Sequence, residues 1–312
     1  CNIFMINLRH IKKFLGLIIL GLLLSSQSFA DKKFDKDLKK VSKNNAFINN
    51  KGEVYSIEEI SDKQNTILVI YSHGSGPDHK MEKCLKSWNL PPLIITNLHN
   101  KEIKGYKVKI YRLCSGVRGW TENERDQMYD DHKKNKKLSV GLKDKEGSIL
   151  INEQLQFVRQ KIIEKKIDIL KDQGFHKIVL AGHSAGAWAS ITLNSKFPEK
   201  INGVIALNPA FAGKIKGRSS FWEDIRKYGI DLINLSNLKN VLIFSHNKDK
   251  YENSKTLSFL SKLDSVDFND LGKSNCKAKR KFNKHHGLTL TKCFAASENN
   301  QKKIIKYLEG IL

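Results

Sequence analysis

The sequence predicts an α/β protein in which a mostly parallel central sheet is covered by helices on both faces. Continuous apolar, β-branched runs, typical of buried parallel strands, alternate along the chain with segments of helical periodicity. One such run, 178–181, leads directly into the pentapeptide GHSAG at 182–186 and then into an Ala- and Leu-rich segment. Alternating strands and helices produce parallel sheets because each crossover returns over a face of the sheet.

The predicted elements follow one another from residue 46. The segment 46–55 is predicted to be a short hairpin because apolar runs flank an Asn-Asn-Lys-Gly turn. Between 153 and 172 apolar residues recur at helical spacing, and Gly174 ends that helix. The other strands are expected at 66–71, 108–113, 178–181, 201–207, 241–245 and 266–268, and the other helices at 81–88, 185–193, 254–263 and 301–312.

Two segments interrupt this alternation. Residues 213–237 form a small insertion between strands, with Phe221, Trp222 and a helix through Tyr228. Residues 115–152 are the least regular part of the chain, and a loop this long in a compact domain is usually functional or mobile. We expect both segments to shape a pocket.

The N-terminus has the pattern of a secretory signal peptide. Arg9, Lys12 and Lys13 form a positive region, and the apolar run 14–24 that follows is too short to span a bilayer comfortably. Residues 28–30, Ser-Phe-Ala, supply the small residues of a cleavage site. The alternative is an uncleaved membrane anchor.

Cleavage near Ala30 would export the protein to the periplasm or the medium. Residues 1–30 are then the signal peptide, and 31–312 form one α/β domain, with 213–237 as a small cap insertion. A chain of 312 residues that is 40% hydrophobic is long and apolar enough for one large domain of this class.

The cysteines agree with an oxidising compartment. Cys1 leaves with the signal peptide, and Cys84, Cys114, Cys276 and Cys293 remain, an even number. Four cysteines allow three pairings, of which proximity in sequence favours Cys84–Cys114 and Cys276–Cys293. The alternative is four buried free thiols. The chain contains no C-x-x-C pair, so neither a zinc site nor a redox motif is indicated.

The formal charge of +23 comes mainly from lysine, since only eight of the 55 basic residues are arginine. Dedicated phosphate and nucleic-acid sites use arginine forks, so the lysines indicate a solubilising surface rather than a nucleic-acid partner. A weak attraction to anionic surfaces is compatible with this charge.

The pentapeptide 182–186 points to nucleophilic chemistry. In G-x-S-x-G the serine occupies a sharp strand-to-helix turn, where only small neighbours fit and where Oγ projects from the sheet. Serine needs a base, and the base needs a carboxylate to orient it. Asp249 follows the strand 241–245, and His285 and His286 follow later, which is the order Ser, Asp, His.

With His73-Gly74, these motifs resemble the α/β-hydrolase superfamily from about Thr66 to the C-terminus. The resemblance implies an eight-stranded sheet and hydrolysis of carboxylic esters, small or polymeric, through a Ser-His-Asp triad without cofactor or metal. It implies Ser184 as nucleophile, Asp249 as acid and His286 as base, because glycine often follows the base in this family. His285 is the alternative base.

The resemblance also implies an oxyanion hole formed by the backbone N–H groups of Ala185 and Ser75. The pair Cys276–Cys293 would then close the loop that carries the two histidines. His183 is expected to line or pack the site, and His246 to support Asp249.

The positions of several other side chains in the sequence indicate their surroundings. Trp188 is predicted in the core, and Phe221-Trp222 is a candidate pocket wall. Asp130, Asp131 and His132 stand beside a lysine run and are interpreted as a solvated face rather than a metal site.

The sequence is also compatible with two other functions. One is a serine peptidase acting on short peptides with the same triad. The other is a catalytically silent binding protein, because a fold alone does not determine function.

Overall fold

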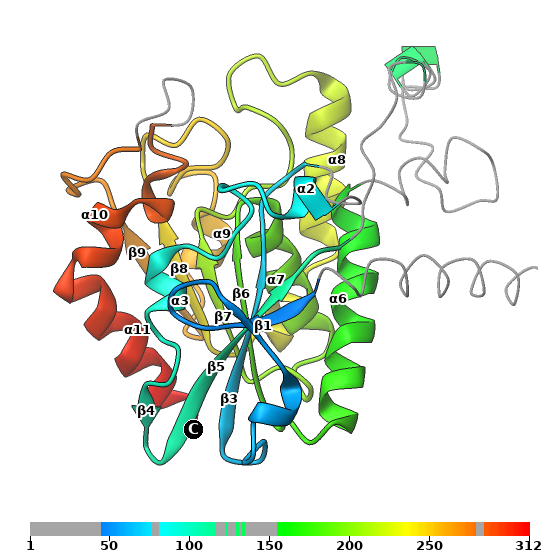
Figure 1. The fold of residues 1–312 in the computed structure, drawn as a ribbon. Helices are drawn as coiled ribbons and strands as arrows, with labels where there is room; N and C mark the ends of the chain where they lie inside the picture. Colours follow the sequence, from blue (N-terminus) through cyan, green and yellow to red (C-terminus); the bar gives the residue numbers. More distant parts are fainter. Residues whose placement is uncertain are drawn as a thin grey trace, which may run out of the picture. The chain divides into compact units, whose positions relative to one another are not determined.

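The computed structural model describes residues 45–76, 81–115, 155–278 and 284–312, together with six positions between 123 and 134. Residues 44–312 belong to one compact unit, shown as a ribbon in Figure 1. The predicted signal peptide and most of the 115–152 segment lie outside the described residues.

The described strands form one mostly parallel sheet. Its order is β2-β1-β5-β3-β6-β7-β8-β9, and β4 pairs only with β5. The six strands from β5 to β9 along this order are parallel, whereas β1, β2 and β4 pair antiparallel. The strands are β1 (Ala46–Ile48), β2 (Val54–Tyr55), β3 (Thr66–Ser72), β4 (Glu102–Ile103), β5 (Tyr106–Leu113), β6 (Lys177–His183), β7 (Gly203–Leu207), β8 (Val241–Ser245) and β9 (Val266–Asp270).

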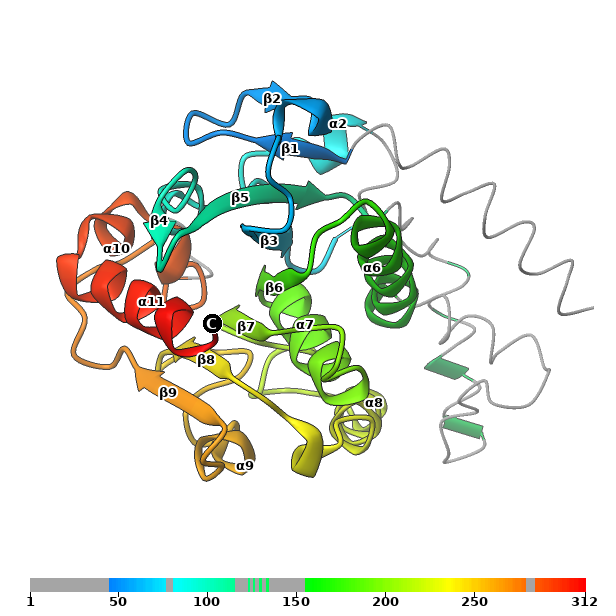
Figure 2. The same ribbon diagram turned by 90° about the horizontal axis from the view of Figure 1, so that it is seen from below.

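Helices cover both faces of this sheet, as predicted. Figure 2 shows α6 and α7 against one face and α10 and α11 against the other. The helices are α2 (Met81–Cys84), α3 (Leu93–Thr96), α6 (Leu155–Asp172), α7 (Ala185–Lys196), α8 (Ser220–Asp231), α9 (Ser258–Ser261), α10 (Lys292–Ala296) and α11 (Glu298–Gly310), with 3-10 turns η1 (Ile57–Glu59), η2 (Leu235–Asn237) and η3 (Leu288–Leu290). Among the described helices, none combines the length and apolar character needed to cross a membrane.

The core consists of the central strands and the helix faces that pack on them. All seven residues of β3 are buried, which agrees with its continuous apolar sequence. On one face, Phe294, Ile304 and Leu308 from α10 and α11 join the strand residues in a single apolar cluster. On the other face, Trp188 of α7 is buried and stacks on Phe211, with ring centroids 5.2 Å apart, so its predicted core position is confirmed.

Some element boundaries differ from the prediction. The helices expected at 81–88 and 254–263 are only four residues long, and the C-terminal helix is preceded by α10 because Ser297 has extended dihedrals. The sheet has nine described strands rather than the eight that the resemblance implied. The additional strand β4 pairs with β5, and a turn at Lys104 and Gly105 connects the two strands. The φ angles of these residues, 49° and 82°, are typical of a tight hairpin turn.

Both predicted disulfides are present. Cys84 of α2 pairs with Cys114 after β5, with a Cα–Cα distance of 5.8 Å. Cys276 pairs with Cys293 of α10, at 5.6 Å. Two structural disulfides are typical of a protein that folds in an oxidising location outside the cytosol.

Candidate active site

The candidate site lies at the carboxyl ends of the parallel strands. Because β3, β6, β7 and β8 are parallel neighbours, the residues that follow them meet at one edge of the sheet. These residues are the loop 73–76, Ser184, Asn208 and the turn 246–249. Side chains that are far apart in the sequence are therefore brought together here.

Ser184 occupies the strained turn that the pentapeptide predicted. Its φ of 56° and ψ of −119° lie outside the common regions for L-residues, directly between β6 and α7. A Cβ added at Gly182 would collide with the backbone of Gly186, and one added at Gly186 would collide with the Ser72 carbonyl. Both glycines are therefore needed for the sheet and helix to approach this closely around the serine.

Asp249 and His286 form a buried hydrogen-bonded pair. Nδ1 of His286 lies 2.7 Å from Oδ2 of Asp249. A carboxylate can only accept, so Nδ1 carries the proton of the neutral ring and Nε2 keeps a lone pair. The Tyr251 N–H donates to Oδ1 of Asp249 at 2.9 Å, and Nδ2 of Asn208 donates to Oδ2 at 3.3 Å. The carboxylate is thus held from three sides.

The two candidate bases lie in different surroundings. The ring of His286 packs against Tyr251 and His183, with centroids 4.6 and 4.8 Å away. The ring of His285 instead lies against His246, with centroids 4.2 Å apart. Of the two histidines, the structure therefore brings His286 to Asp249.

His183 supports the backbone of His286. Its Nε2 lies 2.9 Å from the carbonyl oxygen of His286, so Nε2 is the protonated nitrogen. Burial, reinforced by the neighbouring rings of His286 and His73, lowers the pKa of His183 to about 3. The ring therefore stays neutral and holds this donor in place at ordinary pH.

A cavity of about 550 Å³ joins these groups. Ser184, His286, Gly74 and Ser75 form one part of its lining. Its apolar walls are Trp88, Phe211, Trp222, Tyr251, Ala210, Ala212 and Leu290. The size and mixed lining are those of a small-molecule site. Of the predicted pair Phe221-Trp222, only Trp222 lines this cavity, whereas Phe221 is buried.

Ala185 and the loop that carries Ser75, the two predicted sources of oxyanion donors, lie next to Ser184. Ala185 is the first residue of α7, where backbone N–H groups have no acceptor within the helix. The loop that carries Ser75 passes directly over the serine, since a Cβ added at Gly74 would be 3.1 Å from Cβ of Ser184.

Other predicted residues have simpler surroundings. Nδ1 of His246 accepts from the Lys248 N–H at 2.9 Å, and its carbonyl accepts from the Asp249 N–H, so His246 shapes the turn that carries Asp249. Asp130 is exposed and forms an ion pair with Lys133. Among the described residues, no three His, Cys, Asp or Glu side chains are grouped to hold a metal ion.

Asn208 was not predicted to have a role at the site. It has a φ of 46°, is fully buried, and accepts a hydrogen bond from Oγ1 of Thr289 at 2.9 Å while it donates to Asp249. The sequence contained one usable signal, a polar residue directly after the apolar strand 201–207.

The strand order and the serine turn between β6 and α7 together decide the fold. The chain has the α/β-hydrolase fold. A variation within this α/β-hydrolase sheet is the N-terminal hairpin, in which β1 pairs with β5 and β2 lies at the edge.

Comparisons with solved structures find similar chains at low sequence identity. A monoacylglycerol lipase from Paleococcus ferrophilus is 15% identical, with a TM-score of 0.44 over 86% of this chain and 98% of that chain. Est1E from Butyrivibrio proteoclasticus, solved with ferulic acid, is 12% identical, with a TM-score of 0.44 over 80% of this chain and 90% of that chain. No family model and no curated protein sequence matches the chain.

Proposed function

We propose that the protein is an exported serine hydrolase that cleaves carboxylic esters. The observation that supports this most directly is the 2.7 Å contact between His286 and Asp249 in a cavity that Ser184 also lines. A nucleophile, an oriented base and backbone donors around one space are the requirements of acyl transfer.

In the proposed reaction, Oγ of Ser184 attacks the ester carbonyl while Nε2 of His286 takes the hydroxyl proton. The negative charge that develops on the carbonyl oxygen is stabilised by the N–H groups of Ala185 and Ser75. His286 then gives its proton to the leaving alcohol, and an acyl-enzyme remains. Water, activated by the same histidine, releases the acid and restores the serine.

The cavity favours an ester with an apolar group. Trp88, Phe211 and Trp222 provide aromatic surface close to Ser184, and an apolar acyl or alcohol part would bury area against them. Small-molecule and polymeric esters both meet this requirement. No nucleic-acid partner is proposed.

A fluorophosphonate probe and matched substrates test this function. The purified chain should be labelled at Ser184, and labelling and ester turnover should both disappear in Ser184→Ala. Ser236→Ala, which changes a serine of the exposed turn η2, should keep both. Labelling with turnover of amides but not esters would identify a serine peptidase instead. Absence of labelling in the folded protein would identify a binding protein.

Export has a separate test. Expression of the full chain in a bacterium and mass spectrometry of the periplasmic fraction should give a mature protein that begins at Asp31. A full-length protein retained in the membrane would contradict the cleavage.

A further inference from the structure

The loop 73–76 has to hold a backbone N–H at a fixed place if it is to stabilise an oxyanion. It contains two glycines, so its own sequence gives it little rigidity. The loop nevertheless forms hydrogen bonds with a side chain that lies about 85 residues later in the sequence. That side chain is Arg159 of α6.

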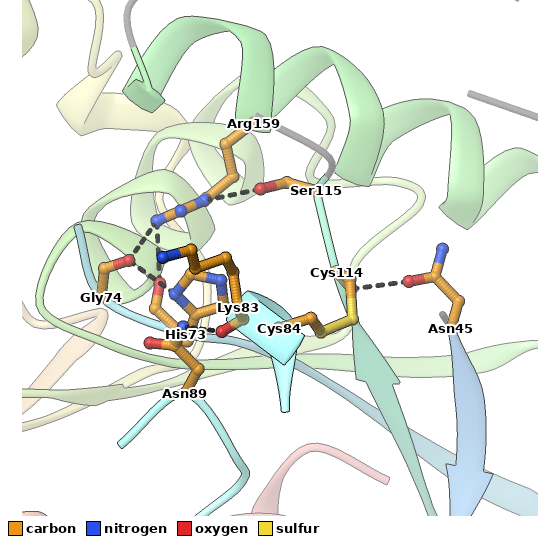
Figure 3. The surroundings of a disulfide bond; sticks show 9 residues. All are labelled: Asn45, His73, Gly74, Lys83, Cys84, Asn89, Cys114, Ser115 and Arg159. Atoms are coloured by element: carbon orange, nitrogen blue, oxygen red, sulfur yellow. Dashed lines mark hydrogen bonds between the residues drawn. A yellow bond between two sulfur atoms is a disulfide. The ribbon is translucent and has the colours of Figure 1, made fainter. Parts of the chain in front are cut away.

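Arg159 is fully buried, and its hydrogen bonds converge on this loop. Nη1 donates to the carbonyl oxygens of His73 and Gly74, both at 2.8 Å, and Nη2 is 3.5 Å from the carbonyl oxygen of Gly76. Figure 3 shows the guanidinium between the carbonyls of His73 and Gly74 and the side chain of Ser115, whose Oγ accepts from Nε at 3.2 Å. The charged guanidinium group of Arg159 thus donates to several backbone carbonyl groups of the loop 73–76.

The direction of the Ser75 N–H follows from this contact. The Gly74 carbonyl and the Ser75 N–H belong to the same peptide unit, and no described peptide bond is cis. In a trans peptide these two groups point in opposite directions. Because Arg159 and Nδ1 of His73 both bind the Gly74 oxygen, at 2.8 Å each, the Ser75 N–H is turned away from them. Gly74 and Ser75 also line the cavity.

We infer that Arg159 is the positioning residue of the oxyanion hole: it binds the carbonyl oxygens of the loop 73–76 and so directs the Ser75 N–H to the reacting oxygen. The inference rests on the proposed function and concerns how the same site is built. Arg159 does not touch the substrate. It acts through the peptide plane that it orients.

Arginine suits this position for a physical reason. Its planar fork reaches several acceptors at once in a fixed geometry, whereas the ammonium group of lysine is a single mobile point charge. Only eight of the 55 basic residues in this chain are arginine, so an arginine at this buried position is unlike the lysine that predominates elsewhere. Burial also strengthens the charge-assisted bonds to the carbonyls.

Ser115, which binds Nε of Arg159, lies next to a disulfide in the sequence. Ser115 directly follows Cys114, which is bonded to Cys84, and the Cys114 N–H donates to Oδ1 of Asn45 at 2.6 Å. Figure 3 shows this disulfide next to the arginine and the loop. The guanidinium is therefore held at Nε by the end of β5 while its other nitrogens hold the loop.

Turnover by Arg159→Lys and Arg159→Met tests the inference. We expect kcat for a p-nitrophenyl ester to fall about 100-fold, as after loss of one oxyanion donor, with KM within about threefold of wild type. Wild type should prefer an ester to its thionoester, since hydrogen-bond donors bind oxygen better than sulfur, and this preference should shrink in both variants. Ser115→Ala, which keeps the guanidinium, should show the same changes to a smaller extent.

The control is Lys166→Met, which removes another buried cation of α6, one that lies over the Tyr111 ring. It should retain wild-type kcat and the wild-type preference for the ester. A folded Arg159 variant with kcat near wild type would overturn the inference. So would a loss of kcat that leaves the ester-to-thionoester ratio unchanged, because that pattern indicates general damage.

A crystal structure of Arg159→Lys separates this inference from the proposed function. The Gly74–Ser75 peptide should be rotated or displaced, with β3 and α7 unchanged. An undisturbed peptide would overturn the inference whether or not the protein hydrolyses esters. A displaced peptide in a protein whose wild type lacks turnover would support it while the ester hydrolase proposal fails.

Discussion

Nδ1 of His286 lies 2.7 Å from Oδ2 of Asp249, although 37 residues separate them in the sequence. Both side chains are almost fully buried, and the Asp249 carboxylate also accepts from Tyr251 and Asn208. Three groups, from the connections after β7 and β8 and from the loop before α10, therefore meet at one carboxylate. This contact fixes the protonated nitrogen of the imidazole and leaves the other nitrogen as a base.

The first prediction concerns this contact. Asp249→Asn should lower kcat for an ester by about 10⁴-fold, because an amide can stabilise the wrong tautomer of His286 and cannot stabilise its charged form. Steady-state kinetics and circular dichroism would show lost turnover in a folded protein. Asp264→Asn, at an exposed position, is the matched control. Near-normal turnover in Asp249→Asn would exclude Asp249 as the acid.

The second prediction concerns the space over the nucleophile. In Gly74→Ala the new methyl group would lie 3.1 Å from Cβ of Ser184 and 3.3 Å from Nδ1 of His183. The neighbours must move by a few tenths of an ångström, so we expect kcat/KM to fall about tenfold or more with little change in melting temperature. Gly310→Ala, where a Cβ would meet no atom within 4 Å, should change neither quantity.

The third prediction concerns pH and stability. The pKa of His183 is lowered by burial to about 3 in the folded protein and returns to about 6.5 on unfolding. Between these values the unfolded chain binds the additional proton. The contribution of neutral, buried His183 to the free energy of unfolding is therefore complete above about pH 6.5. It is lost as pH falls toward 3, at up to about 1.4 kcal/mol per pH unit.

Urea unfolding at several pH values measures this contribution. In His183→Gln the slope between about pH 6.5 and 3 should be smaller than in wild type by up to one proton. His246 and His285, whose pKa values burial also lowers, remain in both proteins and contribute equally. Equal slopes in wild type and His183→Gln would contradict the role of His183.

The fourth prediction concerns the buried carboxylate three residues after Asp249. Oε1 of Glu252 accepts from Nη2 of Arg218 at 3.0 Å and from Nε of Arg226 at 2.7 Å. Glu252→Gln leaves two largely buried guanidinium groups without their counter-charge, which should cost about 3–5 kcal/mol of unfolding free energy. Denaturant melts would show this loss. Glu223→Gln, an exposed change on α8, the helix that carries Arg226, should show almost none.

The fifth prediction concerns the disulfide Cys276–Cys293, which encloses the loop that carries His285 and His286. Mild reduction should lower activity before the core unfolds, because the loop that positions the base loses its constraint. Cys276→Ser with Cys293→Ser should show the same order of events, at a cost of about 3 kcal/mol in stability. Simultaneous loss of activity and near-ultraviolet circular dichroism would count against this coupling.

Much of the sheet was predictable because its strands are buried on both sides. Runs such as 66–71 and 241–245 are apolar without interruption, and such runs are strands when helices cover both faces. The short elements α3 and β4 were not predicted, because four helical residues or a two-residue strand give no periodic signal. Their position depends on the neighbours they pack against.

The candidate site was predictable only in part. The sequence placed Ser184 on a strand-to-helix turn and Asp249 after a strand, since both follow from local patterns. It left His285 and His286 as alternatives, because adjacent residues in a loop have no periodicity that separates them.

The sequence by itself determined the order of strands and helices and the glycines around Ser184, because neighbouring residues and steric limits decide these features. It favoured the two cysteine pairs only through their proximity in the chain. The tertiary structure decided that His286 rather than His285 meets Asp249, that Asn208 binds the same carboxylate, and that Arg159 binds the loop 73–76. Those contacts join residues tens of positions apart. They exist only once parallel strands bring their carboxyl ends to one edge, and no local pattern in the chain specifies that meeting.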